Sequence, residues 1–348
     1  MSGYLQDGLA SRSYAIIGNA MRDAEAELLY HYTSEAGLRG IIENDNIWAT
    51  DIHFLNDWTE FTHVFNEEAV GAFVESYLAA LPTNLDSDAR KVTIEGVLAR
   101  RNFPKLLDII ESRPPMGKPK EAFVCSFTAD AVAGGNPGDR LSQWRGYSQS
   151  SQGFSLGFDR TLLSRQIEKQ DNHDDATAEL VKCIYDDEEK LSLFGDMGRA
   201  AATEFLALRD RGEVVPDSFT TARQNPEYRA TCYYLLKALT KLTPKFYKTA
   251  AQVKHRGFIE EHEWRVVFYA FHKSLLPRLK FRGGQFGATP FVEIALGLRK
   301  AETCSLRRIV IGPSTHQADN KHAVELLLGK HGINAVEVAS SLIPYRSA

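Results

Sequence analysis

The segment from residue 28 to residue 34, LLYHYTS, constrains the fold more than any other stretch of the chain. Large apolar and more polar side chains alternate along it, which is the period-two pattern of a β-strand. Ser34 then precedes a helical pattern that places Leu38, Ile41 and Ile42 on one face. The sequence therefore predicts a strand that ends directly at a capped helix, where backbone N–H groups can bind a ribose, a phosphate or a carboxylate.

Composition and charge are those of a globular protein without a dominant basic or acidic surface. The chain has 348 residues and a formal net charge of −4, so neither nucleic acid nor membrane is indicated as a partner by charge. No apolar run approaches the length that spans a bilayer, and we predict a single cytoplasmic domain over residues 1–348. The cysteines are widely scattered, which argues against a zinc site and against a disulfide framework.

Short strand-like segments are interrupted by two long stretches with helical patterns. We predict an α+β fold with a central mixed or antiparallel sheet and mostly helical insertions at about 58–113 and 166–253. In the first insertion, Asn56 or Asp57 is expected to cap a helix that reaches about residue 81. Further strands are predicted at 123–128, 153–159, 181–185, 290–296 and 306–313.

An acidic cluster precedes a strand of β-branched and aromatic residues near residue 264. Because residues two apart share a face of a strand, Glu261, Glu263 and Arg265 are predicted to project together. Adjacent carboxylates raise at least one carboxyl pKa and cost stability, which favours a functional site over a purely structural one. The alternative is an exposed edge strand, in which such charges block aggregation.

The segment QWRGY at 143–147 lies between a glycine-rich stretch and a polar one. We predict that it contributes to a pocket wall, with Arg145 meeting a phosphate or carboxylate and an aromatic ring beside the ligand. The alternative makes Trp144 a core anchor and Arg145 the partner of a helix C-terminus.

The order of motifs resembles bacterial domain-of-unknown-function family 2971 over most of the chain. The motifs are LYHYTS (29–34), FLND with a following glutamate (54–60), CSF (125–127), QWRGY (143–147), GFSLGFD (153–159), EHEWR (261–265) and IVIGP (309–313). A more distant resemblance is to ADP-ribosyltransferases. It rests on a strand-borne histidine with a nearby threonine, an intermediate strand with hydroxyl residues, and a late Glu-x-Glu strand.

The second resemblance implies a split, ADP-ribosyltransferase-like sheet and NAD as co-substrate. Glu263 would stabilise the positive charge that develops as the nicotinamide–ribose bond breaks, and Glu261 would orient the acceptor. His31 would bind the ribose of NAD that does not carry nicotinamide. Glu263, Glu261 and His31 are the catalytic residues that the resemblance implies. The acceptor, a protein or a nucleic acid, is not identified by the sequence, and the chain would act as a toxin or defence factor.

The same resemblance implies a set of NAD-binding residues: His31, Tyr32, Thr33, Ser126, Arg145, Tyr147 and Arg265. Tyr147 would offer a ring on which nicotinamide stacks, and Thr33 would assist His31. The hydroxyl of the middle strand is either Ser126 or Ser148.

Two other function classes remain open at this point. A metal-dependent nuclease or hydrolase would hold a divalent cation with the carboxylates of Asp57, Glu60, Glu261 and Glu263. A non-catalytic nucleotide sensor would instead hold an anionic ligand with His31, Arg145 and Arg265.

Overall fold

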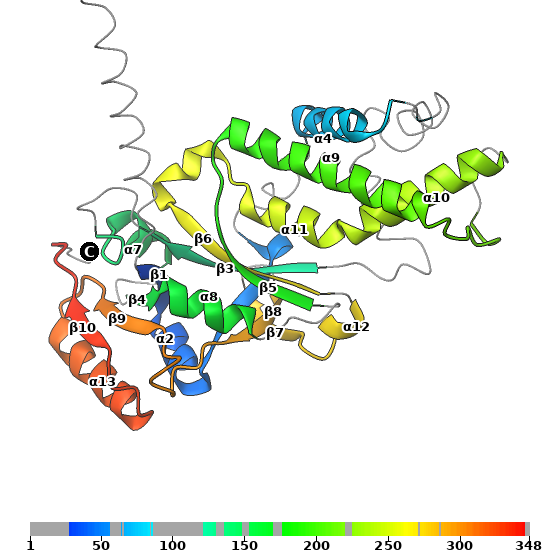
Figure 1. Ribbon diagram of the computed structural model, residues 1–348. Coiled ribbons are helices and arrows are strands. Elements are labelled where there is room, and N and C mark those ends of the chain that lie inside the picture. Colours follow the sequence, from blue (N-terminus) through cyan, green and yellow to red (C-terminus); the bar gives the residue numbers. More distant parts are fainter. Residues whose placement is uncertain are drawn as a thin grey trace, which may run out of the picture.

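A computed structural model describes residues 28–55, 64, 66–83, 85, 121–129, 136–147, 153–169, 176–219, 225–270, 272–284 and 287–344 (Figure 1). The strands are β1 (Leu28–Ser34), β2 (Asn46–Asp51), β3 (Glu121–Thr128), β4 (Gly153–Asp159), β5 (Ala176–Lys182), β6 (Glu263–Ala270), β7 (Lys280–Gly284), β8 (Gly287–Ala295), β9 (Leu306–Ile311) and β10 (Glu337–Ser340). The α-helices are α2 (Glu35–Asn44), α4 (Glu67–Ala80), α7 (Leu141–Tyr147), α8 (Arg160–Glu168), α9 (Asp187–Asp210), α10 (Pro226–Lys241), α11 (Thr243–Gln252), α12 (His272–Leu275) and α13 (Gln317–Lys330). The described residues also include the 3-10 helices η1 (Ile52–Phe54) and η3 (Arg256–Glu261).

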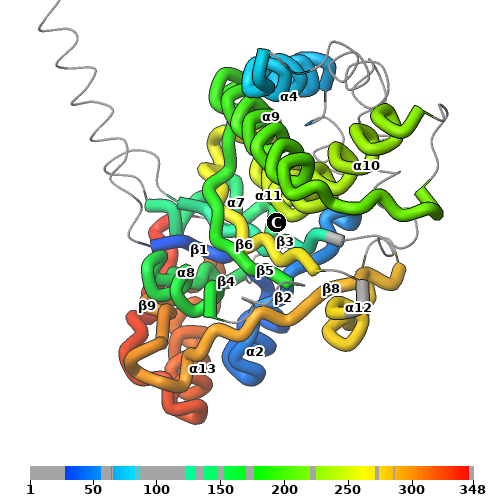
Figure 2. Tube along the Cα trace, turned by 45° about the vertical axis from the view of Figure 1, so that its right-hand side comes forward, coloured from blue at the N-terminus to red at the C-terminus, as the bar shows by residue number. Residues whose placement is uncertain are grey.

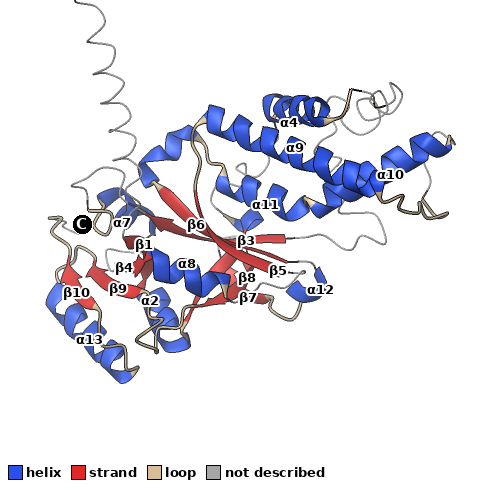
Figure 3. Ribbon diagram, viewed as in Figure 1, coloured by secondary structure: helices blue, strands red, loops and turns tan. Residues whose placement is uncertain are grey.

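The strands form one mixed sheet, so the predicted α+β class is confirmed at that level (Figure 3). Its main path runs β10-β9-β4-β1-β3-β2-β8-β7, while β6 joins β3 on one side and β5 on the other. The pairs are antiparallel apart from β9 with β10, which are parallel. The finer assignment to an ADP-ribosyltransferase-like sheet is not confirmed.

One edge of β3 is shared by two strands that diverge from each other. Along its other edge, β3 pairs with β6 from Glu121 to Thr128. On the shared edge, β1 meets β3 at Thr128, and β2 meets it at Phe123 and Val124. The middle of β3 therefore faces an opening between β1 and β2, and these two strands are connected through α2.

Helices cover both faces of the sheet. The main core includes apolar side chains of α2, α8 and α13, among them Ile42, Leu163 and Val324. On the opposite face, α11 packs Tyr247 and Ala251 against β3 and β6. Figures 1 and 2 show α4, α9 and α10 as a further layer beyond α11, and these helices share a second hydrophobic core.

The helix predicted from about residue 58 differs from the one observed. Helix α4 begins at Glu67 because the side chain of Asn66 accepts a hydrogen bond from the Ala69 N–H at 3.0 Å. The caps expected at Asn56 or Asp57 lie outside the described residues.

In the region of the second predicted insertion, 166–253, the described residues contain β5, which joins the sheet, and the helices α9, α10 and α11. That strand spans 176–182 and not 181–185, since its pairing with β6 begins at Ala176 and ends at Lys182. In the part of the chain that the structure describes, no helix combines the length and apolarity needed to cross a membrane.

Candidate functional site

A cavity of about 520 Å³ lies at the opening between β1 and β2. This volume is within the range of about 300–1,000 Å³ that is typical of small-molecule sites. Side chains of β1, α2, β2, β3, α7, η3, β6 and β7 line it. The predicted site residues among the lining are His31, Tyr32, Thr33, Ser126, Tyr147, Glu261 and Glu263. The cavity thus joins segments that are more than two hundred residues apart in the sequence.

His31 binds the backbone of β3 between the points at which β2 and β1 pair with that edge. Its Nδ1 lies 2.9 Å from the carbonyl oxygen of Ser126, so Nδ1 must carry the hydrogen and donate it. Burial lowers the pKa of His31 below its ordinary value; the hydrogen bond to Ser126 acts against this, and the charge of Arg282 adds to it. The imidazole is therefore neutral, which leaves Nε2 as a hydrogen-bond acceptor for a ligand.

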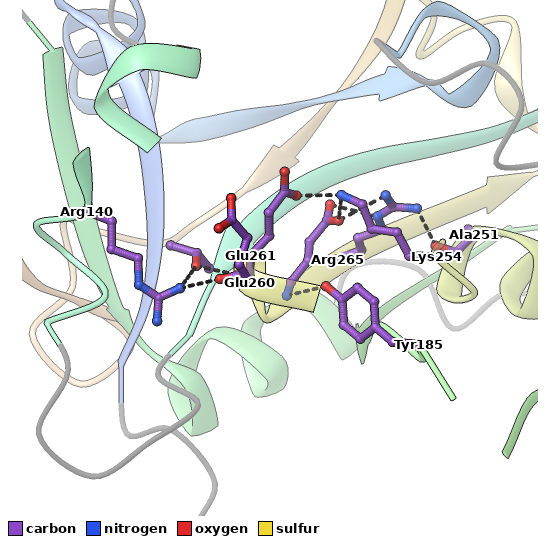
Figure 4. A network of polar contacts seen from close by, with 9 residues as sticks. Arg140, Tyr185, Ala251, Lys254, Glu260, Glu261 and Arg265 are labelled. Carbon is purple, nitrogen blue, oxygen red and sulfur yellow. Dashed lines mark hydrogen bonds and ion pairs between the residues drawn. The ribbon is translucent and has the colours of Figure 1, made fainter. Parts of the chain in front are cut away.

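Glu263 is held by two cations at the start of β6 (Figure 4). Arg265 donates from Nε to Oε1 at 2.8 Å and from Nη2 to Oε2 at 3.0 Å, and Lys254 donates to Oε2 at 2.6 Å. Burial acts to raise the pKa of Glu263, but the charges and hydrogen bonds of Arg265 and Lys254 outweigh it and hold the pKa at about 2. Glu263 is consequently a carboxylate at neutral pH, and the rise predicted for at least one of the adjacent carboxyl pKa values does not occur at Glu263.

Glu261 does not lie in the strand that the sequence predicts for it. It ends η3, and His262 follows in the left-handed conformation with φ of 42°, so β6 begins only at Glu263. The shared face predicted for Glu261, Glu263 and Arg265 is therefore wrong for Glu261. The two carboxylates meet instead through Lys254, whose Nζ lies 2.5 Å from Glu261 Oε2, and this cation removes the expected repulsion.

Arg140 fixes the turn that carries Glu261. Its Nη1 donates to the carbonyl of Glu260 at 2.9 Å and to the Thr128 hydroxyl at 3.2 Å (Figure 4). Thr128 in turn donates to the carbonyl of Glu261 at 2.5 Å. The main chain at the end of β3 and the η3 turn are thus locked together beside the cavity.

Tyr32 lines the cavity, but its hydroxyl is committed to the protein. It donates to the Pro137 carbonyl at 2.6 Å and accepts from the Arg140 N–H at 3.0 Å. Its ring meets Trp144 edge to face. These contacts anchor the loop before α7, so Tyr32 contributes a wall and not a free polar group.

The segment 143–147 is helical, and only part of it reaches the cavity. Gln143 and Tyr147 line the pocket wall, whereas Trp144 is buried and donates from Nε1 to Asp139 at 2.8 Å. Arg145 is exposed and is not among the lining residues, so the anion contact predicted for it has no support. Helical periodicity explains the division, since adjacent helix residues point in different directions.

Arg265 is also absent from the lining, because its guanidinium is occupied inside the protein. Besides binding Glu263, it donates from Nη1 to the Ala251 carbonyl at the end of α11, at 2.8 Å. The ligand contact expected of Arg265 therefore has no support. Of the alternative hydroxyls for the middle strand, Ser126 lines the cavity and Ser148 lies outside the described residues.

Sequence reasoning missed Lys254, Arg140 and Arg282 as residues of the site. Arg140 acts on Glu260, which is distant in the sequence, so one-dimensional spacing gives no indication of this contact. Lys254 lies close in the sequence to Glu261 and Glu263, but the η3 turn between them has no regular spacing from which the ion pairs could be predicted. Arg282 lies on β7 and lines the cavity, yet in the sequence it resembles the cations that ordinarily protect an edge strand.

A carboxylate metal site gains no support from the described part of the chain. There, no group of three or more histidine, cysteine or acidic side chains is arranged to hold a metal ion. Two members of the proposed set, Asp57 and Glu60, lie outside the described residues, so that alternative stays untested.

Comparison with known proteins leaves the activity open. No curated protein and no solved structure matches the chain, and the resemblance to ADP-ribosyltransferases gains no support from these searches. A family model does match over residues 143–266, a range that begins in α7 and ends within β6. Over that range the chain is similar to the family described as "Protein of unknown function (DUF2971)", in agreement with the first resemblance.

Proposed function

We propose that the cavity binds NAD and that the chain transfers ADP-ribose to an acceptor. The observation that supports this most is that His31 and Glu263, placed in separate segments by the sequence, line one cavity. A cavity of about 520 Å³ can hold most of a dinucleotide. The proposal gives a shared purpose to the neutral acceptor on β1 and the carboxylates near β6.

In the proposed reaction, the bond between ribose C1′ and the nicotinamide nitrogen breaks, and its electron pair leaves with nicotinamide. Positive charge then develops on the ribose, and the ionised carboxylate of Glu263 stabilises it. An acceptor nucleophile forms the new bond to C1′ and gives up its proton. Glu261, which is more exposed than Glu263, orients that acceptor and takes the proton.

The remaining lining residues would bind and orient the dinucleotide. Nε2 of His31 would accept a hydrogen bond from a ribose hydroxyl, because Nδ1 is used on Ser126. Tyr147, whose side chain is partly exposed at the cavity wall, would present its ring to an aromatic part of the ligand.

The test is release of nicotinamide from NAD by the full chain in the presence of cell lysate as a source of acceptors. We expect Glu261→Gln and His31→Gln each to lower the rate by about a hundredfold, the loss typical of a single stabilising group. Arg145→Gln serves as the matched control, because Arg145 is exposed and outside the cavity lining. Absence of nicotinamide release and of ADP-ribose transfer by the parent chain would contradict the proposal.

A non-catalytic nucleotide sensor is the second candidate. The pairing of Glu263 with both Arg265 and Lys254 favours it, because such a network also serves as a structural ion pair. A sensor would be stabilised against heat by NAD without releasing nicotinamide, whereas the proposed enzyme would do both.

A further inference from the structure

The charges that line the cavity are unevenly compensated. At the β6 side, Glu261 and Glu263 are matched by Lys254, and Glu263 also by Arg265. At the β7 side, Arg282 lines the cavity, and no carboxylate among the described residues forms an ion pair with it. A positive charge that no carboxylate of the described residues pairs with therefore faces the space where a ligand would lie.

Two residues of β2 hold Arg282 in place. Because β8 lies between β7 and β2, the side chain of Arg282 crosses a neighbouring strand to reach them. Its Nη2 donates to the Thr50 hydroxyl at 2.9 Å, and its guanidinium lies 5.4 Å from the centre of the Trp48 ring. A guanidinium held over an aromatic face keeps its planar donor edge available for a phosphate or carboxylate.

The electrostatic surroundings of Arg282 indicate a position close to His31. Its positive charge contributes to the lowered pKa of His31 and acts against the raised pKa of the Cys125 thiol. Partial burial lowers the pKa of Arg282 itself. An anion beside Arg282 would therefore restore a charge balance that the protein alone does not provide.

The helix α2 makes room for such an anion on another wall of the cavity. Ala36, Gly37, Gly40 and Ile41 line it, and helical spacing places Gly40 near the middle of this face. A Cβ atom added at Gly40 would meet nothing within 4 Å, so open space lies against the helix backbone. Ala36 and Gly37, in the first turn of α2, also line the cavity, and that end of the helix carries partial positive charge.

We propose that Arg282, held by Trp48 and Thr50, binds a phosphate group of the ligand in this cavity. The inference rests on the proposed function, for which it assigns the diphosphate of NAD to the β7 side and the nicotinamide ribose to the Glu263 side. It also gives the exposed strand β7 a specific task. Arg282 takes the role that the sequence suggested for Arg145.

The experiment measures binding of ADP, adenosine and inorganic pyrophosphate to the full chain by calorimetry. The parent is expected to bind ADP more tightly than adenosine, and Arg282→Gln to weaken ADP binding by about ten- to a hundredfold while leaving adenosine unchanged. Pyrophosphate reports the phosphate contact without the base. Arg145→Gln is the control, and melting curves verify that both variants remain folded.

The outcomes separate this inference from the proposed function. The inference is supported if Arg282→Gln loses the preference for ADP over adenosine and Arg145→Gln keeps it. This holds even if the parent releases no nicotinamide, and in that case only the transferase proposal fails. An equal ADP affinity in Arg282→Gln and the parent overturns the inference, even if NAD is turned over. A parent chain that binds neither ADP nor pyrophosphate better than adenosine overturns it as well.

Discussion

The variant Glu263→Gln tests the buried ion network directly. Glutamine keeps the shape of the side chain but removes its charge, so Arg265 and Lys254 remain buried without the anion that binds them both. The free energy can be obtained from the pKa of Glu263, which is about 2 in the folded protein against an ordinary 4.5. That difference corresponds to about 3 kcal/mol, close to the cost of breaking a buried ion pair. We therefore expect a clearly destabilised variant.

The pH dependence of this effect has a definite sign. Because folding lowers the pKa of Glu263, its stabilising contribution is complete well above pH 4.5 and is lost as the pH falls toward 2. Glutamine does not titrate, so the difference between parent and variant must shrink on acidification. We expect it to fall from about 3 kcal/mol at pH 7 to about 2 kcal/mol at pH 3.5.

Urea unfolding followed by tryptophan fluorescence at several pH values measures this difference. The control is Glu179→Gln on β5, because Glu179 pairs with Lys248 at the surface and its loss should cost less than about 1 kcal/mol. The reasoning is refuted if Glu263→Gln unfolds within about 1 kcal/mol of the parent at pH 7, or if the difference grows as the pH falls.

Further predictions concern packing and the cavity. Gly198→Ala should lower the melting temperature, because a Cβ there would lie 2.2 Å from a backbone oxygen of α4 and overpacking costs about 1–3 kcal/mol. The control Gly71→Ala adds its Cβ in open space on α4 and should not lower the melting temperature. In urea titrations, Trp144→Phe should lose about 1 kcal/mol with the hydrogen bond to Asp139, and no change would exclude that bond as a support of α7. Gly40→Leu should raise the melting temperature, because it removes a helix-interior glycine, yet weaken NAD binding at least tenfold in calorimetry; unchanged binding would place the ligand elsewhere.

Much of the sheet is predictable from the sequence because each strand has a local pattern. The run GFSLGFD is β4, and Asp159 caps the following helix by accepting from the Leu162 N–H at 2.9 Å, as a residue before a helical pattern should. The strand β1 and its Ser34 cap follow from the same reasoning, with Ser34 accepting from the Gly37 N–H. Strand alternation and helix N-caps depend on residues only a few positions apart, so they can be recognised from the sequence.

The chemistry of the site is less predictable because it depends on a turn and on contacts that no regular spacing of residues indicates. The left-handed conformation of His262 delays the start of β6 to Glu263, so Glu261 lies outside the strand. Lys254 then joins two carboxylates that were expected to repel each other. The sequence pattern makes both Arg145 and Arg282 exposed arginines. They differ because the side chain of Arg282 crosses β8 to reach Thr50 and lines the cavity, whereas Arg145 does not line it. No local spacing contains that information.

The opening between β1 and β2 has a consequence for synthesis on the ribosome. Its walls include β1 and, more than two hundred residues later in the sequence, Glu263 of β6 and Arg282 of β7, so the cavity is complete only when β7 has emerged. At a synthesis rate of about 5–20 residues per second, that interval lasts on the order of ten seconds or more. In the first part of it, before β3 and β4 have emerged, the nascent β1 lacks its strand partners, and an unpaired strand edge readily joins other chains. The cavity is therefore assembled late, and chaperone protection of the first strand should influence the yield of folded protein.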